Sequence, residues 1–222
     1  MLGFGIDVLA SLVAGVVLLV ATATVSSRAR WLLTGILGRL LDVDIDGVFS
    51  DKRDADADVS KELSRAREVS IFAGRGNDLQ RSTFDPIFLR RPSTKPLRIR
   101  VLLPRTDGAT DFDWTQQRED ELAAFDPAFG RRALLKEQIE NAVRFLDQYV
   151  ANGSVELRRF SCPHIGRIVV TDRCAYFTPY RNDSHGRDCS VYKYRRGELY
   201  DNFARLFEQL WIASDATASG SD

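Results

Sequence analysis

Apolar residues are unevenly distributed along the chain, and the longest uninterrupted group of them lies at its start. Asp7 is the only charged residue between positions 4 and 25. Because about 20 apolar residues span the hydrocarbon core of a bilayer, we expect residues 1–27 to form a single transmembrane helix. Arg28 and Arg30 follow this segment and no basic residue precedes it, which predicts an N-terminus outside the cell and a cytoplasmic body at the inner membrane. A cleaved signal peptide is the alternative, although such peptides begin with basic residues.

Two short segments connect this anchor to the rest of the chain. In residues 28–41, Leu33, Ile36, Leu37 and Leu40 form one apolar stripe, which predicts an amphipathic juxtamembrane helix. That helix would lie at the lipid headgroups or dock on the body of the protein. Residues 42–58 are rich in aspartate and contain one Lys and one Arg. Most such charge runs are solvated, so we expect an acidic linker here.

The body, residues 59–213, alternates between the two periodicities that are typical of strands and of helices. Alternating or continuous apolar residues predict strands at residues 69–73, 97–103, 155–160, 168–170, 175–177 and 191–194. Stripes with a spacing of three or four predict helices near residues 59–67, 116–124, 135–150 and 199–211. We therefore expect an α/β domain with a mixed sheet flanked by helices. Residues 214–222 are small and polar and should form a disordered tail.

Composition narrows the classes of function. The chain has 31 basic and 31 acidic residues and a net charge of zero, which argues against a broad nucleic-acid-binding surface. Its three cysteines form no disulfide framework, in keeping with a reducing compartment. Cys162 and His164, with His185 and Cys189, offer thiolates and imidazoles, but their spacing is not that of a zinc site. We expect no metal and no cofactor.

The segment from His164 to Asp172 enters a strand and turns at an aspartate. At these residues the chain resembles the phospholipase D superfamily, which carries the motif His-x-Lys-x4-Asp on such a strand hairpin. A strand, a long helix and another strand precede the motif in that family, and the matching order here runs from Val69 to Trp211. The resemblance implies a phospholipase D-like fold. It also implies that His164 would be the nucleophile that attacks phosphorus, if the domain is active.

The motif departs from that pattern in several ways. Gly166 occupies the lysine position and Thr171 the aspartate position, while Arg167 and Asp172 lie one residue late. In a regular strand this shift places Arg167 on the opposite face from His164, and a bulge at Gly166 would restore it. Active members carry two motifs, so a homodimer would have to supply the second one here. If the domain is active, His164, Arg167 and Asp172 are the expected catalytic residues.

A second candidate feature is the loop Gly74–Asp78, which follows a predicted strand at its carboxyl end. Open α/β sheets bind ligands at such ends, although two glycines with Asn-Asp also make an ordinary turn. Arg75 would then meet an anion beside His164 and Arg167. Degenerate phospholipase D-like domains share a Pro-Tyr end of the hairpin, which adds Tyr180 to the expected ligand-binding residues.

These observations lead to two main hypotheses. The first is a membrane-anchored, cytosol-facing, degenerate phospholipase D-like domain that senses or binds an anionic, nucleotide-like or phosphate-containing ligand, or a partner protein. By analogy, bacterial stress response or phage defence would be its setting. The alternative is an active, metal-independent phosphodiesterase or nuclease that works as a homodimer through His164. A membrane-bound interaction subunit without a ligand site is a third reading.

Overall fold

The structure is a computed structural model that describes residues 43–216, apart from 90–96, 108–112, 130–132 and 164. Eight residues nearer the N-terminus are also described, namely 14, 15, 18, 26, 33, 35, 36 and 38. The expected anchor and juxtamembrane helix thus lie mostly outside the described residues. Within the described part of the chain, no helix combines the length and the hydropathy that crossing a bilayer requires.

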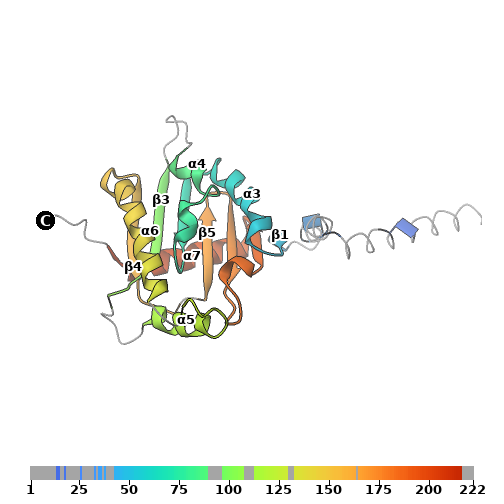
Figure 1. Ribbon diagram of the computed structural model, residues 1–222. Coiled ribbons are helices and arrows are strands. Elements are labelled where there is room, and N and C mark those ends of the chain that lie inside the picture. The colour runs from blue at the N-terminus through green and yellow to red at the C-terminus, as the bar shows by residue number, and fades with distance from the viewer. Residues whose placement is uncertain are drawn as a thin grey trace, which may run out of the picture.

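A mixed sheet of eight strands forms the centre of the domain (Figure 1). The strands are β1 (Ile45–Phe49), β2 (Glu68–Phe72), β3 (Arg98–Pro104), β4 (Val155–Phe160), β5 (Gly166–Thr171), β6 (Cys174–Pro179), β7 (Val191–Arg195) and β8 (Asp215–Ala216). Their order in the sheet is β1-β7-β6-β5-β2-β3-β4-β8. Strands β2, β3 and β4 are parallel to one another, and every other pairing is antiparallel. The predicted α/β class with a mixed sheet is confirmed.

Helices cover both faces of the sheet (Figure 1). One face carries α3 (Lys52–Leu63), the 3-10 turn η1 (Asn77–Gln80), α4 (Asp85–Phe88), α5 (Trp114–Ala123) and α6 (Leu134–Ala151), and the other carries α7 (Glu198–Ala213). A second 3-10 turn, η2 (Gly186–Asp188), precedes β7. Helix α6 buries Leu135, Ile139 and Leu146 completely, and α7 buries Phe207 and Trp211. These are the apolar stripes that predicted both helices, and their burial separates the core into two layers.

The expected acidic linker at residues 42–58 is wrong, because this segment belongs to the folded domain. Its residues form β1, which pairs with β7, and most of α3. Several of its aspartates have partners within the domain. Asp51 accepts hydrogen bonds from the first backbone N–H groups of α3, and Asp58 pairs with the buried Lys193 at 2.8 Å. Charge composition alone could not reveal these partners, since Lys193 lies more than 130 residues away in the sequence.

The domain therefore begins at β1 rather than near residue 59, and the helix expected at 59–67 instead spans Lys52–Leu63. The expected tail also differs at its start. Residues Asp215–Ala216 form β8, which pairs with Arg158 and Arg159 of β4. Residues 217–222 lie outside the described part of the chain.

Candidate functional site

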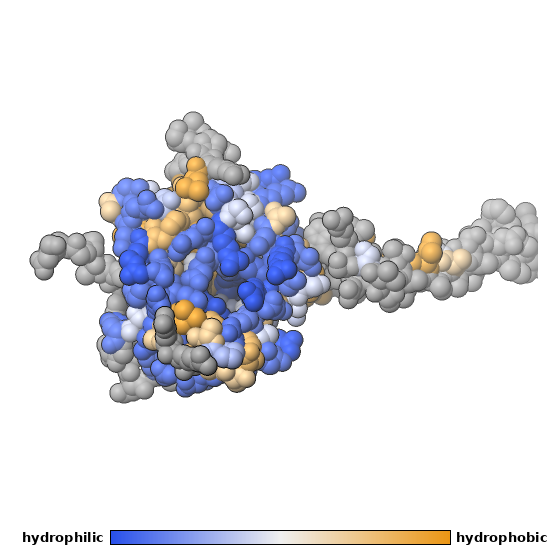
Figure 2. Space-filling model, in the orientation of Figure 1, coloured by the Kyte–Doolittle hydropathy of each residue, from blue (hydrophilic) through white to orange (hydrophobic). Residues whose placement is uncertain are grey.

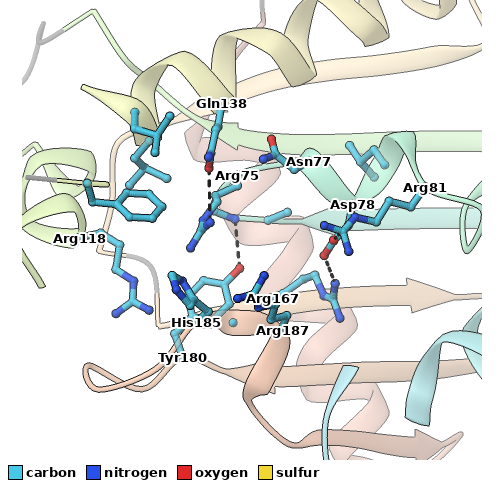
Figure 3. A pocket seen from close by; sticks show the side chains of 18 of the residues that line it. Arg75, Asn77, Asp78, Arg81, Arg118, Gln138, Arg167, Tyr180, His185 and Arg187 are labelled. Atoms are coloured by element: carbon cyan, nitrogen blue, oxygen red, sulfur yellow. Dashed lines mark hydrogen bonds and ion pairs between the residues drawn. The ribbon is translucent and has the colours of Figure 1, made fainter. Parts of the chain in front are cut away.

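A pocket of about 300 Å³ lies at the carboxyl end of β2, where β5 begins beside it (Figure 3). The loop after β2 forms one wall, and α6 and the segment from α5 to Phe129 form others. The loop after β6 closes the remaining side with His185, Gly186 and Arg187. The surface on this side of the domain is largely hydrophilic, with scattered apolar side chains (Figure 2). The pocket occupies the end of the sheet at which open α/β folds bind ligands.

Three of the four expected ligand-binding residues meet in this pocket. Arg75, Arg167 and Tyr180 all line it, although they come from segments about 90 residues apart. The fourth, His164, lies outside the described residues. Of the five arginines in the lining, the sequence singled out Arg75 and Arg167, and their role in binding a ligand stays a prediction.

The structure separates Arg167 from Asp172, the two residues that would act with His164 if the domain is active. These residues lie at opposite ends of β5, which at about 3.3 Å per residue separates them by roughly 16 Å. Asp172 belongs to the turn between β5 and β6, where its carboxylate accepts a hydrogen bond from Arg67 N at 2.9 Å. The hydroxyl of Thr171 accepts hydrogen bonds from two backbone N–H groups of the same turn. Both residues therefore stabilise the turn, away from the pocket.

The bulge that would have restored Arg167 to the other face is also absent from the described strand. Residues Gly166 to Val170 pair with β6 in continuous register. A Cβ atom at Gly166 would lie 2.6 Å from the ring of Phe177 and from the carbonyl oxygen of Thr178. Glycine is required here because β6 approaches closely, and not because the strand bulges.

Arg75 is the most informative side chain of the pocket. Its Cζ atom lies 5.1 Å from the centroid of the Phe129 ring, and Nη1 donates a long hydrogen bond of 3.4 Å to Gln138 Oε1. No carboxylate of the described residues lies within ion-pair distance of it. Burial, together with the neighbouring Arg118 and Arg187, lowers the pKa of Arg75, yet an arginine stays charged at physiological pH. A desolvated cation without a counterion is unfavourable, and an anionic ligand would relieve that cost.

The loop that carries Arg75 is fixed by Gly76. This residue has a φ of 73°, a left-handed conformation that glycine adopts without strain. A Cβ atom at this position would lie 2.7 Å from the Cβ atom of Ala142 on α6. The loop backbone therefore packs directly on α6, and this contact determines where Arg75 enters the pocket.

Arg167 already has a counterion. Its Nη1 atom lies 2.6 Å from Asp78 Oδ2, and Nη2 donates to Thr178 Oγ1 at 3.3 Å (Figure 3). Asp78 also lies near Arg81 at 3.5 Å and Lys52 at 3.6 Å. This carboxylate serves several cations at once, so Arg167 contributes less uncompensated charge to the pocket than Arg75 does.

Tyr180 forms part of the wall between the two arginines. Its hydroxyl accepts a hydrogen bond from Gly74 N at 3.4 Å, and the guanidinium of Arg118 lies over its ring at 5.6 Å. Burial raises the pKa of Tyr180, which keeps the phenol protonated at neutral pH and able to donate to a ligand.

Arg118 organises the loop after β6, and sequence reasoning did not identify it. From α5 it donates to the carbonyl oxygens of Arg181 and Ser184 at 3.0 and 3.1 Å, and it pairs with Glu121 at 2.8 Å. The partners in the loop lie more than 60 residues away, so helical periodicity gave no signal for this contact. Arg118 thereby fixes the loop segment that presents His185.

His185 is the second residue that sequence reasoning did not place in the pocket. Its Nε2 atom lies 3.2 Å from Asp126 Oδ2, and its ring contacts those of Phe125 and Phe129. Burial is the largest cause of a lowered pKa of His185, and the charges of Arg75 and Arg187 lower it further, while Asp126 opposes them. The imidazole is therefore neutral in the free protein at neutral pH.

The lining of the pocket is strongly basic. Five arginines line it against two aspartates, which leaves an excess of three positive charges with His185 neutral. Within the described residues, no group of His, Cys, Asp and Glu is arranged to hold a metal ion, and the three cysteines are free. The arrangement suits the binding of a multiply charged anion.

No protein-family model matches the chain, and no curated protein matches it. Among solved structures it is similar to TrmBL2, an archaeal chromatin protein with a novel mode of DNA binding, at 11% identity and a TM-score of 0.47. That similarity covers 86% of this chain but only 62% of TrmBL2. The chain is also similar to Nuc of Salmonella typhimurium, a phospholipase D family member, at 10% identity and a TM-score of 0.42, over 76% of this chain and 95% of Nuc. Both TM-scores lie below 0.5, so the function proposed below rests on the residues of this chain alone.

Proposed function

We propose that this protein is a membrane-tethered domain that binds a small phosphate-containing anion in the arginine-rich pocket, without acting on it as an enzyme. One observation carries the proposal. Arg75 is a half-buried cation at the carboxyl end of a central strand, and no carboxylate of the described residues is its counterion. Guanidinium groups in such positions bind phosphate in a bidentate manner.

The size and chemistry of the pocket narrow the class of ligand. A volume of about 300 Å³ lies at the lower end of the range for small-molecule sites. Beside the arginines, the lining includes the apolar side chains of Trp114, Phe129 and Leu135. An anion with a planar or apolar portion, such as a nucleotide, complements both parts of this lining.

The tether is the apolar segment at residues 4–25, which is long enough to cross a bilayer. The basic residues that follow it would retain the domain on the cytoplasmic side of the inner membrane. We include in this proposal that the domain is phospholipase D-like, an assignment that rests on the motif at residues 164–172. We also include a role in bacterial stress response or antiviral defence, which rests on an analogy with the architecture alone.

The alternative, a phosphodiesterase that acts through His164, has less support. Such an enzyme needs its basic and acidic motif residues beside the nucleophile. Arg167 is instead paired with Asp78, and Asp172 lies in a turn at the other end of β5. No other observation among the described residues favours hydrolysis over binding.

A thermal-shift screen of nucleotides and inorganic phosphate on the full-length protein in detergent tests the proposal, because a ligand that binds the native state raises its Tm. We expect at least one phosphate-containing compound to raise the Tm, and Arg75→Gln to abolish this shift. Arg65→Gln is the matched control, since Arg65 is exposed on the surface. If no anion raises the Tm, the proposal is wrong. Turnover of a chromogenic phosphodiester or single-stranded DNA that His164→Ala abolishes would establish the enzymatic alternative instead.

A further inference from the structure

Two arginines and a neutral histidine face the same part of the pocket. Arg75 and His185 both contact the ring of Phe129, at 5.1 and 6.0 Å between the group centres. Figure 3 draws the side chain of Arg187 beside them. Within the part of the chain that the structure describes, Arg187 has one ion pair, a long and exposed one of 3.6 Å with its neighbour Asp188. These side chains come from loops on two sides of the pocket, so an anion between them would be bound from both sides.

We propose that the ligand presents a dianionic terminal phosphoryl group, which Arg75, Arg187 and His185 bind together with one proton that His185 takes up. This inference rests on the anion-binding function proposed above and specifies its chemical class. Inorganic phosphate and a phosphate monoester share the required group. A phosphate diester does not, because it has a single negative charge and two free oxygens in place of three.

The donor set matches that group in number and in charge. Among the described residues, Arg75 donates a hydrogen bond only from Nη1, to Gln138, which leaves its other N–H groups for a ligand. Arg187 brings a second guanidinium, and a protonated His185 brings a third donor. Three cationic donors complement three terminal oxygens that share two negative charges. A diester offers the three cations one negative charge in place of two, which leaves more of their charge uncompensated in a partly desolvated site.

The charges around His185 explain why it takes up a proton when the ligand binds. The groups that face it are Asp126 on the segment after α5, Arg75 on the loop after β2, and Arg187 and Asp188 on its own loop. In the free protein, burial and the two arginines keep the pKa of His185 below its ordinary value. A bound dianion neutralises those arginines and itself favours the imidazolium, so the pKa rises when the ligand binds.

The sign of the pH dependence follows from this shift. A group whose pKa is higher in the complex than in the free protein binds a proton when the ligand binds, so the affinity falls as the pH rises through the pKa of the complex. A phosphate monoester has its second pKa near 6. The monoester is therefore mostly dianionic at pH 7, so few protons leave it when it binds.

Isothermal titration of the full-length protein in detergent tests the inference. Adenosine 5′-monophosphate and its 3′,5′-cyclic diester share base and sugar but differ in the phosphoryl group, and inorganic phosphate is the third probe. We expect the monophosphate to bind at least tenfold more tightly than the cyclic diester. Titrations at pH 7.0 in two buffers of different ionisation enthalpy should show net proton uptake. His185→Gln should remove the uptake, and Arg65→Gln should leave it unchanged.

The outcomes separate this inference from the function on which it rests. Equal affinity for the monophosphate and the cyclic diester, or binding without proton uptake, would overturn the inference and leave anion binding intact. Absence of binding by all three probes would overturn both. Binding of inorganic phosphate that the monophosphate does not exceed would identify free phosphate as the source of the group. Asp126→Asn is the second variant: it retains the imidazole but removes the carboxylate that favours imidazolium, so the proton uptake should fall while the fold is retained.

Discussion

Lys193 Nζ lies 2.8 Å from Asp58 Oδ2, and this buried ion pair joins the first helix of the domain to the strand beside the edge of the sheet. Tyr176 donates a hydrogen bond to the same carboxylate oxygen at 2.6 Å. Glu62 lies 3.4 Å from the ammonium group and completes its surroundings on α3. Lys193 therefore ties α3 to the sheet, in addition to the backbone pairing of β1 with β7.

Replacing Lys193 with Met should destabilise the domain. The change leaves the half-buried Asp58 without its cation, whereas Glu62 keeps its ion pair with Arg173. Breaking a largely buried pair from one side costs about 3 kcal/mol. Urea unfolding followed by circular dichroism measures the loss. Arg181→Met removes a fully exposed ion pair with Asp183 and should leave the midpoint unchanged. An unchanged midpoint for Lys193→Met would mean that the pair does not hold β1 and α3 to the sheet.

Replacing Asp78 with Asn should increase the affinity for anions. Asp78 neutralises Arg167 at 2.6 Å, so its loss adds a free positive charge to the pocket. If solvent screens the added charge as it does near a protein surface, the binding free energy improves by about 1 kcal/mol. This gain corresponds to an affinity about fivefold higher. Titration with adenosine 5′-monophosphate measures it. The double variant with Arg167→Gln should return to the affinity of the unmodified protein; a gain that persists in this double variant would show that Arg167 is not responsible.

Replacing Gly76 with Ala should cost more stability than the same change at Gly153. Both glycines have a φ near 74°, so each alanine carries a left-handed backbone cost of about 1–2 kcal/mol. Only Gly76 is also crowded, by Ala142 at 2.7 Å, whereas nothing lies within 4 Å of Gly153. The additional loss at Gly76 should be about 1–3 kcal/mol, measured by urea unfolding. Equal losses at the two positions would contradict the close approach of the loop to α6.

The helices and central strands could be predicted from the sequence because their signals are local. The stripe from Leu135 to Leu146 lies within one helix, and the alternation in β3 lies within one strand. The contacts of the pocket and of α3 instead join residues that lie far apart in the sequence. Arg118 meets the carbonyls of Arg181 and Ser184, and no local pattern in the sequence encodes such a distant pairing.

Strand geometry explains why Asp172 lies away from Arg167. Motif spacing suggested that Arg167 and Asp172 act together. On an extended strand, however, residues that are five positions apart lie far from each other in space. Arg75 and Arg167 both line the pocket for a different reason. Each lies at the end of a strand on the same side of the sheet, and the topology brings these ends together.

Asp113 provides a test of stability against pH. It caps α5 and pairs with Lys136 at 2.8 Å. Burial alone would raise its pKa, but the hydrogen bonds from Lys136, Thr115 and Gln116 prevail and lower the pKa to about 2. A depressed pKa adds stability above the unfolded value, and this contribution is lost as the pH falls through about 2. Asp113→Ala should cost about 1 kcal/mol at pH 7. The difference from the unmodified protein should shrink below pH 4 in urea titrations; a difference that stays constant to pH 2 would exclude the carboxylate as its source.

The position of β1 predicts where the chain can be shortened. Deleting residues 1–42 removes nothing from the described sheet and should leave a cooperative unfolding transition. Deleting residues 1–58 removes β1 and the carboxylate of Asp58, which exposes β7 as a new edge and leaves Lys193 without its nearest counterion. That shorter chain should aggregate or unfold, as size-exclusion chromatography and circular dichroism would show. A monomeric, folded product of the shorter chain would restore the acidic-linker interpretation.

The pocket lies beside the boundary between β5 and β2, which divides the eight strands into two groups of four. Strands β1 and β8 form the two borders of the sheet and come from the two ends of the described chain. Thermal fraying begins at such borders, and it would have to remove three strands from either side before reaching this boundary. Amide hydrogens of β2 and β5 should therefore be the last to exchange with deuterium. A force that pulls on either end of the described chain would separate the outer strands before it reached the two strands beside the pocket.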